Sequence, residues 1–121
     1  MQSIQQIQDQ IIDEFNFFQD WSEKYQYLID LGKNLPKFKD SNRIDSNLIK
    51  GCQSKVWLNS SYDNNIVIFE ADSDAIISKG IISLLIRVFS GHTPQEIISA
   101  SVDFIDKMGL NSHLSQTRAN G

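Results

Sequence analysis

The sequence of 121 residues has few of the groups that metal and disulfide sites require. It contains one cysteine and two histidines. One cysteine cannot form an internal disulfide, which is typical of proteins from a reducing compartment. A structural zinc site usually needs four Cys or His ligands, and an iron–sulfur cluster needs several cysteines. We therefore expect no metal site formed by this chain alone.

Dense positive charge and long apolar runs are also absent. The formal net charge is −4 and the lysines and arginines are scattered, so we expect no nucleic-acid partner. The longest apolar stretch, residues 81–89, contains Ser83 and Arg87 and is too short to span a bilayer. The N-terminus, MQSIQQIQDQIIDEF, is acidic and amphipathic, unlike a signal or transit peptide. We expect a cytoplasmic protein that forms a single domain over residues 1–121 and has no membrane partner.

The first part of the chain has the periodicity of two helices. Apolar residues recur at helical spacing over residues 4–15 and again from 21 to about 31. Asp20 and Glu23 form the pattern of a capping box before the second helix. Gly32 is placed to end that helix, because glycine is the usual residue after a helix C-terminus.

The period then changes to that of strands. Apolar and polar residues alternate in residues 53–62, whereas residues 66–72 are rich in β-branched residues. The Asp-Asn-Asn run at 63–65 between them consists of residues that tolerate positive φ. This pattern predicts a β-hairpin. A short third strand is expected near residues 43–44.

The last part of the chain returns to helical spacing. Residues 75–90 are apolar almost all round, so we expect a central helix packed on the hairpin, with Gly80 permitting a close backbone approach. Thr93 and Glu96 form a second capping-box pattern, and short helices are expected over 94–99 and 102–108. The predicted fold class is therefore α+β, with a small antiparallel sheet packed against a helical layer.

The only cysteine, Cys52, stands just before the first predicted strand and allows three readings. A free cysteine is often a buried apolar side chain, and alternation puts Cys52 on the face of Val56 and Leu58 that we assign to the core. A cysteine hydrolase would need a nearby base, for which His113 is the candidate because His92 lies in a turn where we expect it to be exposed. A thiol that exchanges sulfur with a partner needs no general base.

Sulfur exchange requires a partly ionised and accessible thiol. An ordinary cysteine is ionised to about 3% at pH 7. The neighbouring Lys50 and Lys55 favour the thiolate, whereas burial disfavours it. Gly51 has no side chain, so it allows another protein's backbone to come close to Cys52. Residue patterns alone leave the three readings open.

Three stretches together resemble the SufE family of sulfur-acceptor proteins. They are LIKGCQSKVWL, ADSDAIISKGIISLLIRVFSGHTPQEI and MGLNSHLSQTRANG, and the similarity extends from Trp21 to the last residue. The resemblance implies an α+β fold like that of the IscU scaffolds. Those scaffolds use several cysteines, so the single cysteine here favours a sulfur carrier over a scaffold.

The resemblance also implies a role. A SufE-like protein takes persulfide sulfur from a PLP-dependent cysteine desulfurase of the SufS type, here onto Cys52, and stimulates that enzyme. It then delivers the sulfur to the SufBCD scaffold complex for iron–sulfur cluster assembly. PLP belongs to the partner, so no cofactor is expected in this chain. A CsdE-type paralogue that serves a different desulfurase, or a regulatory module that binds a desulfurase without chemistry, are the alternatives.

Further residues match the family's loop and partner-binding positions. These are Gly51, Gln53, Asp74, His113 and Arg118. For Asp74 the alternative is that the Asp-Ser-Asp run at 72–74 only caps the central helix. For Arg118 the alternative is an ordinary surface arginine.

Two departures from the family pattern concern the tail. The family's Ser-Pro-Ser-Arg motif reads Ser-Gln-Thr-Arg at residues 115–118. Family members continue past this region into a further C-terminal helix, whereas this chain ends at Gly121. We therefore expect the domain without that helix.

Overall fold

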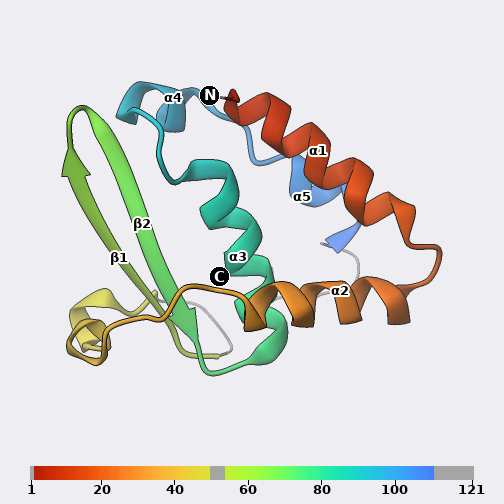
Figure 1. Cartoon of the computed structure of the whole chain (residues 1–121), viewed down its shortest axis with the longest axis horizontal. Helices are drawn as coiled ribbons and strands as arrows, with labels where there is room; N and C mark the ends of the chain where they lie inside the picture. The colour runs from red at the N-terminus through yellow and green to blue at the C-terminus, as the bar shows by residue number, and fades with distance from the viewer. Residues whose placement is uncertain (1, 50–53, 111–121) are drawn as a thin grey trace.

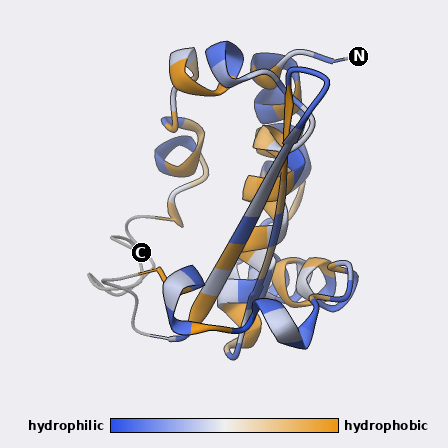
Figure 2. Cartoon of the chain, turned by 90° about the vertical axis from the view of Figure 1, so that its left-hand side faces the viewer, coloured by the Kyte–Doolittle hydropathy of each residue, from blue (hydrophilic) through white to orange (hydrophobic). Residues whose placement is uncertain are grey.

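A computed structural model describes residues 2–49 and 54–110. The chain forms an α+β domain, as predicted, in which helix α3 lies between a β-hairpin on one side and helices α1 and α2 on the other (Figure 1). Figure 2 looks onto the hairpin, with the helices behind it. The elements in chain order are α1 (Ile4–Phe17), α2 (Trp21–Lys33), β1 (Val56–Asp63), β2 (Ile66–Ser73), α3 (Ile76–Phe89), α4 (Pro94–Ser99) and α5 (Phe104–Lys107).

Side-chain caps begin three of the helices. Asp20 accepts a hydrogen bond from the backbone N–H of Glu23 at the start of α2. Thr93 and Glu96 form the predicted reciprocal capping box at the start of α4, and Ser3 forms the corresponding box at the start of α1 with Gln6. These caps satisfy backbone donors that have no partner within the helix, so they fix where each helix begins.

Helices α2 and α3 cross at two glycines. A Cβ atom on Gly80 would lie 2.1 Å from the carbonyl oxygen of Leu28, and one on Gly32 would lie 2.8 Å from the Cβ of Lys79. The close approach predicted at Gly80 is confirmed. The prediction that Gly32 ends α2 is wrong, because the helix continues to Lys33. Gly32 is a packing residue whose missing side chain makes room for α3.

The main core lies among the helices. Ile11, Phe15 and Leu28 are completely buried and pack with residues of α3, α5 and the turn after α5. Phe15 also makes an edge-to-face contact with Trp21, whose ring centroid is 5.7 Å away. Burial of this apolar surface is the main force that stabilises the helical layer. No helix in the described ranges is long and apolar enough to cross a membrane.

The hairpin is confirmed, with changes at its ends. β1 and β2 pair antiparallel from Val56 opposite Ser73 to Asp63 opposite Ile66. Asn64 and Asn65 both have positive φ, 52° and 63°, as a tight two-residue hairpin turn requires. The first strand begins at Val56 rather than at residue 53, which lies outside the described residues.

The third strand predicted near residues 43–44 is wrong. The sequence Asp-Ser-Asn occurs on both sides of this position and forms a 3-10 turn each time, at Asp40–Asn42 and Asp45–Asn47. Short polar side chains of this kind favour turns because they hydrogen-bond to nearby backbone groups. The additional bridge to β1 comes from Leu48, which pairs with Trp57.

One ion pair links α1, α2 and α3. Arg87 donates two hydrogen bonds to the carboxylate of Glu14, of 2.8 and 2.7 Å, and the hydroxyl of Tyr27 donates to Glu14 at 2.6 Å. The hydrogen bonds from Arg87 lower the pKa of Glu14 to about 2. Burial opposes this change, and the hydrogen bond from Tyr27 adds to it. Burial and the hydrogen bond to Glu14 raise the pKa of Tyr27 to about 12.

We predict that Gly80→Ala destabilises the fold strongly. The new methyl group would meet the backbone of Leu28, which cannot move without shifting α2. Overpacking against backbone should lower the free energy of unfolding by about 3 kcal/mol. Urea unfolding measures this, with Ser83→Ala one turn further along α3 as the control. Equal stability of Gly80→Ala and wild type would contradict the close crossing.

We also predict a pH-dependent contribution from Glu14. Its folded pKa of about 2 lies below the ordinary 4.5, so its contribution is complete above about pH 4.5 and is lost as pH falls toward 2. Glu14→Gln should lower the free energy of unfolding at pH 7 by about 1 kcal/mol, because the pair is partly exposed and solvent weakens it. Urea unfolding at pH 7 and at about pH 3 tests this; a difference of the same size at both pH values would argue against it.

Candidate functional site

Cys52 lies in residues 50–53, which fall outside the described residues together with 111–121. The candidate site is therefore defined by the residues that hold the two ends of this cysteine segment. We call Leu48 and Ile49 the incoming stem, and Ser54 and Lys55 the outgoing stem. Both stems lie where the start of β1, the end of β2 and the start of α3 meet.

The incoming stem is bound to β1. The backbone N–H of Ile49 donates to the carbonyl of Val56 at 2.9 Å, and Leu48 forms a β-bridge with Trp57. These contacts fold the chain back on itself directly before and after the cysteine segment. The chain therefore returns, after residue 53, to a position next to its starting point.

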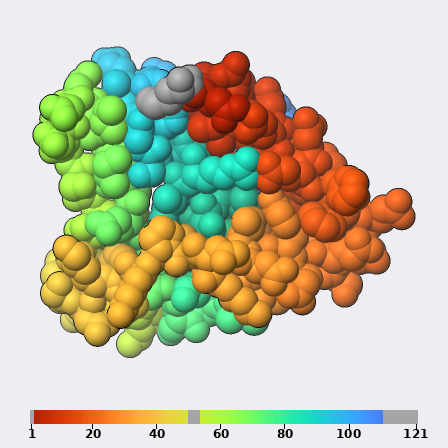
Figure 3. Space-filling view, in the orientation of Figure 1, coloured from red at the N-terminus to blue at the C-terminus, as the bar shows by residue number. Residues whose placement is uncertain are grey.

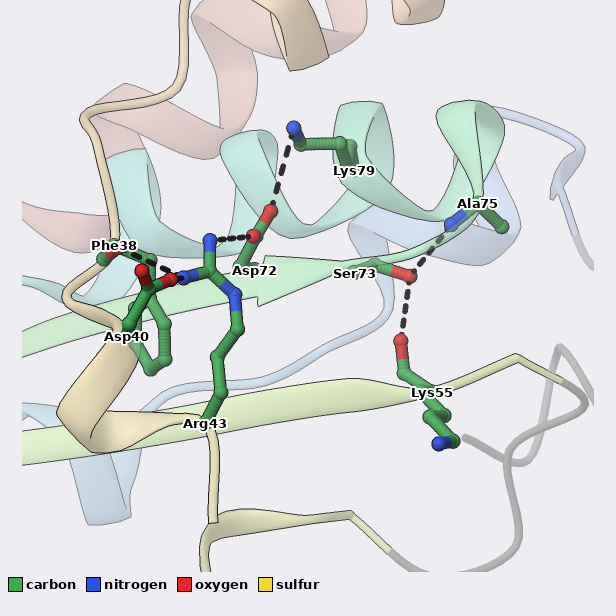
Figure 4. A network of polar contacts seen from close by, with 8 residues as sticks. All are labelled: Phe38, Asp40, Arg43, Lys55, Asp72, Ser73, Ala75 and Lys79. Atoms are coloured by element: carbon green, nitrogen blue, oxygen red, sulfur yellow. Dashed lines mark hydrogen bonds and ion pairs between the residues drawn. The ribbon is translucent and has the colours of Figure 1, made fainter.

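The outgoing stem is bound to the end of β2 and to α3. The carboxylate of Asp74 accepts from the backbone N–H of Lys55 at 3.0 Å, and the N–H of Asp74 donates back to the carbonyl of Lys55 at 3.2 Å. The hydroxyl of Ser73 donates to the same carbonyl at 2.8 Å, and Figure 4 shows this contact. The hydroxyl groups of Ser54 and Ser78 lie 3.0 Å apart and share a hydrogen bond.

Asp74 does not cap the central helix. The N-cap residue of α3 is Ala75, which has no side-chain cap, and the Ala75 N–H donates to the hydroxyl of Ser73 at 3.2 Å. The Asp74 carboxylate instead contacts the backbone of Lys55 in the outgoing stem, while Ser73 of the same run accepts from the N–H of the N-cap residue. Asp74 is the one predicted site residue that lies within the described residues.

Asp72 is the centre of a charged network beside the stems. Arg43 donates to its Oδ2 at 2.6 Å, and the ammonium group of Lys79 lies 3.3 Å from its Oδ1 (Figure 4). Arg43 also donates to the carbonyl of Phe38 at 3.1 Å and pairs with Asp40. Burial opposes the ionisation of Asp72, but hydrogen bonds from Arg43, the Ser73 backbone and Lys79 hold its pKa below the ordinary value.

An apolar cavity of about 420 Å³ lies between the hairpin and the helices. Its walls are side chains of β1, β2, α3 and the region around α4, and they include Ile49 of the incoming stem and Val56 at the start of β1. Figure 3 shows the surface hollowed between the hairpin and the helices beside it. The prediction that Val56 and Leu58 share an inward face is confirmed, because both line this cavity.

The prediction that His92 is exposed is wrong. Only 2% of its surface is accessible, and its Nδ1 lies 3.4 Å from a carboxylate oxygen of Glu96. Backbone hydrogen bonds pull this turn against the hairpin: Val67 donates to the His92 carbonyl, and Gly91 donates to the Val67 carbonyl. His92 follows the end of α3, whereas the outgoing stem contacts its beginning.

Several predicted site residues lie outside the described part of the chain. They are Gly51, Cys52, Gln53, His113 and Arg118. Within residues 2–49 and 54–110, no three His, Cys, Asp or Glu side chains gather as a metal site.

Sequence reasoning did not identify the roles of Arg43, Ser73 and Asp72. The strand register was the available signal, since it places Ser73 opposite Val56 and Asp72 opposite Trp57, beside both stems.

The fold and these contacts define an α+β domain in which the two stems that flank the single cysteine in the sequence are both bound at the base of a hairpin. The model of the SufE family, described as an Fe-S metabolism associated domain, matches residues 9–121. The chain belongs to this family.

Two curated relatives agree with this assignment, and a solved structure shares the fold. An uncharacterized SufE-like protein of Rhizobium meliloti is 41% identical over 118 residues, covering 93% of this chain and 84% of the relative. A second, from Rhizobium etli, is 40% identical and covers 93% of this chain and 80% of the relative. The solution structure of a hypothetical protein from Thermus thermophilus has a TM-score of 0.75 at 16% identity, covering 95% of this chain and 84% of that one, and so shares its fold.

We predict that Asp74→Ala exposes the outgoing stem. Loss of the carboxylate removes the acceptor for the Lys55 N–H, so the exchange rate of this amide hydrogen should rise about tenfold. Hydrogen exchange followed by NMR measures it residue by residue. Asp63→Ala at the far end of β1 is the control and should leave the Lys55 rate unchanged. Equal Lys55 exchange in Asp74→Ala and wild type would count against the contact.

Proposed function

We propose that this protein accepts sulfane sulfur on Cys52 from a PLP-dependent cysteine desulfurase of the SufS type, stimulates that enzyme and delivers the sulfur to a SufBCD-type scaffold. Membership of the SufE family supports a role in iron–sulfur metabolism. The observation that carries the finer proposal is the single cysteine, which stands in the Gly-Cys-Gln-Ser sequence at 51–54. It is the one thiol in the chain on which sulfur could be held.

The proposed reaction is a thiol–persulfide exchange. The thiolate of Cys52 attacks the terminal sulfur of a persulfide on the desulfurase, forming a new sulfur–sulfur bond. The bond between that sulfur and the desulfurase cysteine breaks, and this cysteine leaves as a thiolate. Cys52 becomes a persulfide, and no electrons are gained or lost overall. A second exchange of the same kind would pass the sulfur to the scaffold.

The arrangement of the stems supports this chemistry. The exchange needs no general base, and within the described residues His92 is buried and lies beyond the far end of α3 from the outgoing stem. It does need a thiolate aligned with the bond that breaks. Both ends of the cysteine segment are held by hydrogen bonds to β1, β2 and α3, which supports such alignment.

The other predicted positions complete the proposal. Gly51 would allow the desulfurase backbone to come close to Cys52, and Gln53 would steady the cysteine segment. His113 and Arg118 are proposed as contacts to the desulfurase. The single cysteine also supports a reducing compartment, and we propose the cytoplasm. Unlike the desulfurase, the chain would need no PLP of its own.

The direct test is intact-mass measurement after incubation with a SufS-type desulfurase, PLP and cysteine. We expect wild type to gain the mass of one sulfur atom, and Cys52→Ser to gain none. The adduct should disappear on reduction, as a persulfide does. Absence of the adduct from wild type, or its presence on Cys52→Ser, would sink the proposal.

Stimulation of the desulfurase separates the remaining alternatives. If Cys52 carries the sulfur, Cys52→Ala should lose the stimulation. Full stimulation by Cys52→Ala would instead identify a regulatory module that acts by binding alone. Stronger stimulation of a different type of desulfurase than of a SufS-type enzyme would identify a CsdE-type paralogue.

A further inference from the structure

Asp72 contacts the chain on the incoming side of the cysteine segment. It is 9% exposed and lies at the end of β2, opposite Trp57. Its carboxylate binds Arg43 at 2.6 Å, and Arg43 in turn binds the carbonyl of Phe38 at 3.1 Å. The segment that leads to the incoming stem is therefore tied through Arg43 to β2 (Figure 4).

The same carboxylate contacts α3. Lys79 lies 3.3 Å from its second oxygen, and Lys79 is next to the glycine at which α2 and α3 cross. Asp72 thus joins three parts of the chain: the segment before the incoming stem, the hairpin and the central helix. The next two residues, Ser73 and Asp74, bind the outgoing stem at Lys55.

We propose that Asp72, acting through Arg43 and Lys79, is a positioning residue for sulfur acceptance at Cys52, because it fixes the incoming side of the cysteine segment against the outgoing side. The inference rests on the proposed function. It assigns Asp72 no contact with the reacting sulfur atoms. Its effect is exerted through the described stems.

The chemical reason is alignment. In thiol–persulfide exchange the attacking sulfur, the transferred sulfur and the leaving sulfur must align. A displacement of about 1 Å in such a geometry can lower a rate by about 100-fold. Since residues 50–53 connect the two stems, the relative position of the stems limits where Cys52 can lie, and Asp72 holds Arg43 in the segment that leads to the incoming stem.

A matched control exists in the helical layer. Glu14 and Arg87 form a comparable carboxylate–arginine pair, at 2.7 Å, that joins α1 to α3. Both side chains of that pair are partly exposed, and neither contacts a stem residue in the described structure. Glu14→Gln therefore removes an ion pair of the same type without changing the stems.

The first experiment needs no desulfurase. Cys52 is the only thiol, so the rate of its reaction with a small aromatic disulfide reports on this position alone. We expect Asp72→Asn and Arg43→Met each to raise the rate at least fivefold, because loosening the segment that leads to the incoming stem gives the disulfide easier access to Cys52. Glu14→Gln should stay within twofold of wild type, and Arg43→Lys should fall between wild type and Arg43→Met.

Urea separates local loosening from global unfolding. A rate that rises through local opening is nearly independent of low urea concentrations, whereas one that needs global unfolding increases steeply with urea. We expect the thiol-reaction rate of Asp72→Asn to be nearly independent of low urea concentrations. The inference would be overturned if the Asp72→Asn rate increased steeply with urea. It would also be overturned if that rate were within twofold of the wild-type rate or below it, or if Glu14→Gln raised the rate equally.

The second experiment measures transfer itself. In single turnovers with persulfidated desulfurase, Asp72→Asn should lower the maximum transfer rate about tenfold and change the half-saturating concentration less than twofold. Glu14→Gln should change neither. If wild type accepts sulfur and Asp72→Asn matches its maximum rate, the inference fails alone. If wild type accepts none, the proposed function fails, and the thiol-reaction rates still decide whether Asp72 positions Cys52.

Discussion

The close crossing of α2 and α3 is the constraint on which the rest of the structure depends. Gly80 leaves space for the backbone of Leu28, and Gly32 leaves space for the backbone and Cβ of Lys79. Because Lys79 is held at this crossing, its ammonium group reaches Asp72 at the end of β2. The packing of the helical layer therefore positions Lys79, one of the two cations that bind Asp72 at the end of the hairpin.

Much of the fold could be predicted from the sequence, because apolar residues recur with different periods in helices and in strands. Capping residues and the Asn-Asn turn located the element ends to within a few residues. Gly32 was misread because glycine is also used where another helix comes close, and its contact with Lys79 and Gly80 of α3 is not visible in the sequence. His92 was misread because its burial depends on backbone bonds to Val67, far away in the sequence.

The candidate site could be predicted only in part. Motifs singled out Cys52 and Asp74, and the contact of Asp74 with the outgoing stem lies across the base of the hairpin. Arg43 gave no such signal, since it is 29 residues from Asp72 and lies in a polar segment without periodicity. Family membership supports a role in iron–sulfur metabolism. The polar network around the stems, in contrast, joins residues that are brought together only by the three-dimensional fold.

The most direct test of the central claim follows isotopically labelled sulfur through one turnover. Persulfidated desulfurase is mixed with the protein, and digestion with mass spectrometry locates the label over time. We predict that label leaves the desulfurase at the rate at which it appears on the peptide that contains Cys52. Label that stays on the desulfurase or appears as free sulfide, while this peptide remains unlabelled, would contradict it.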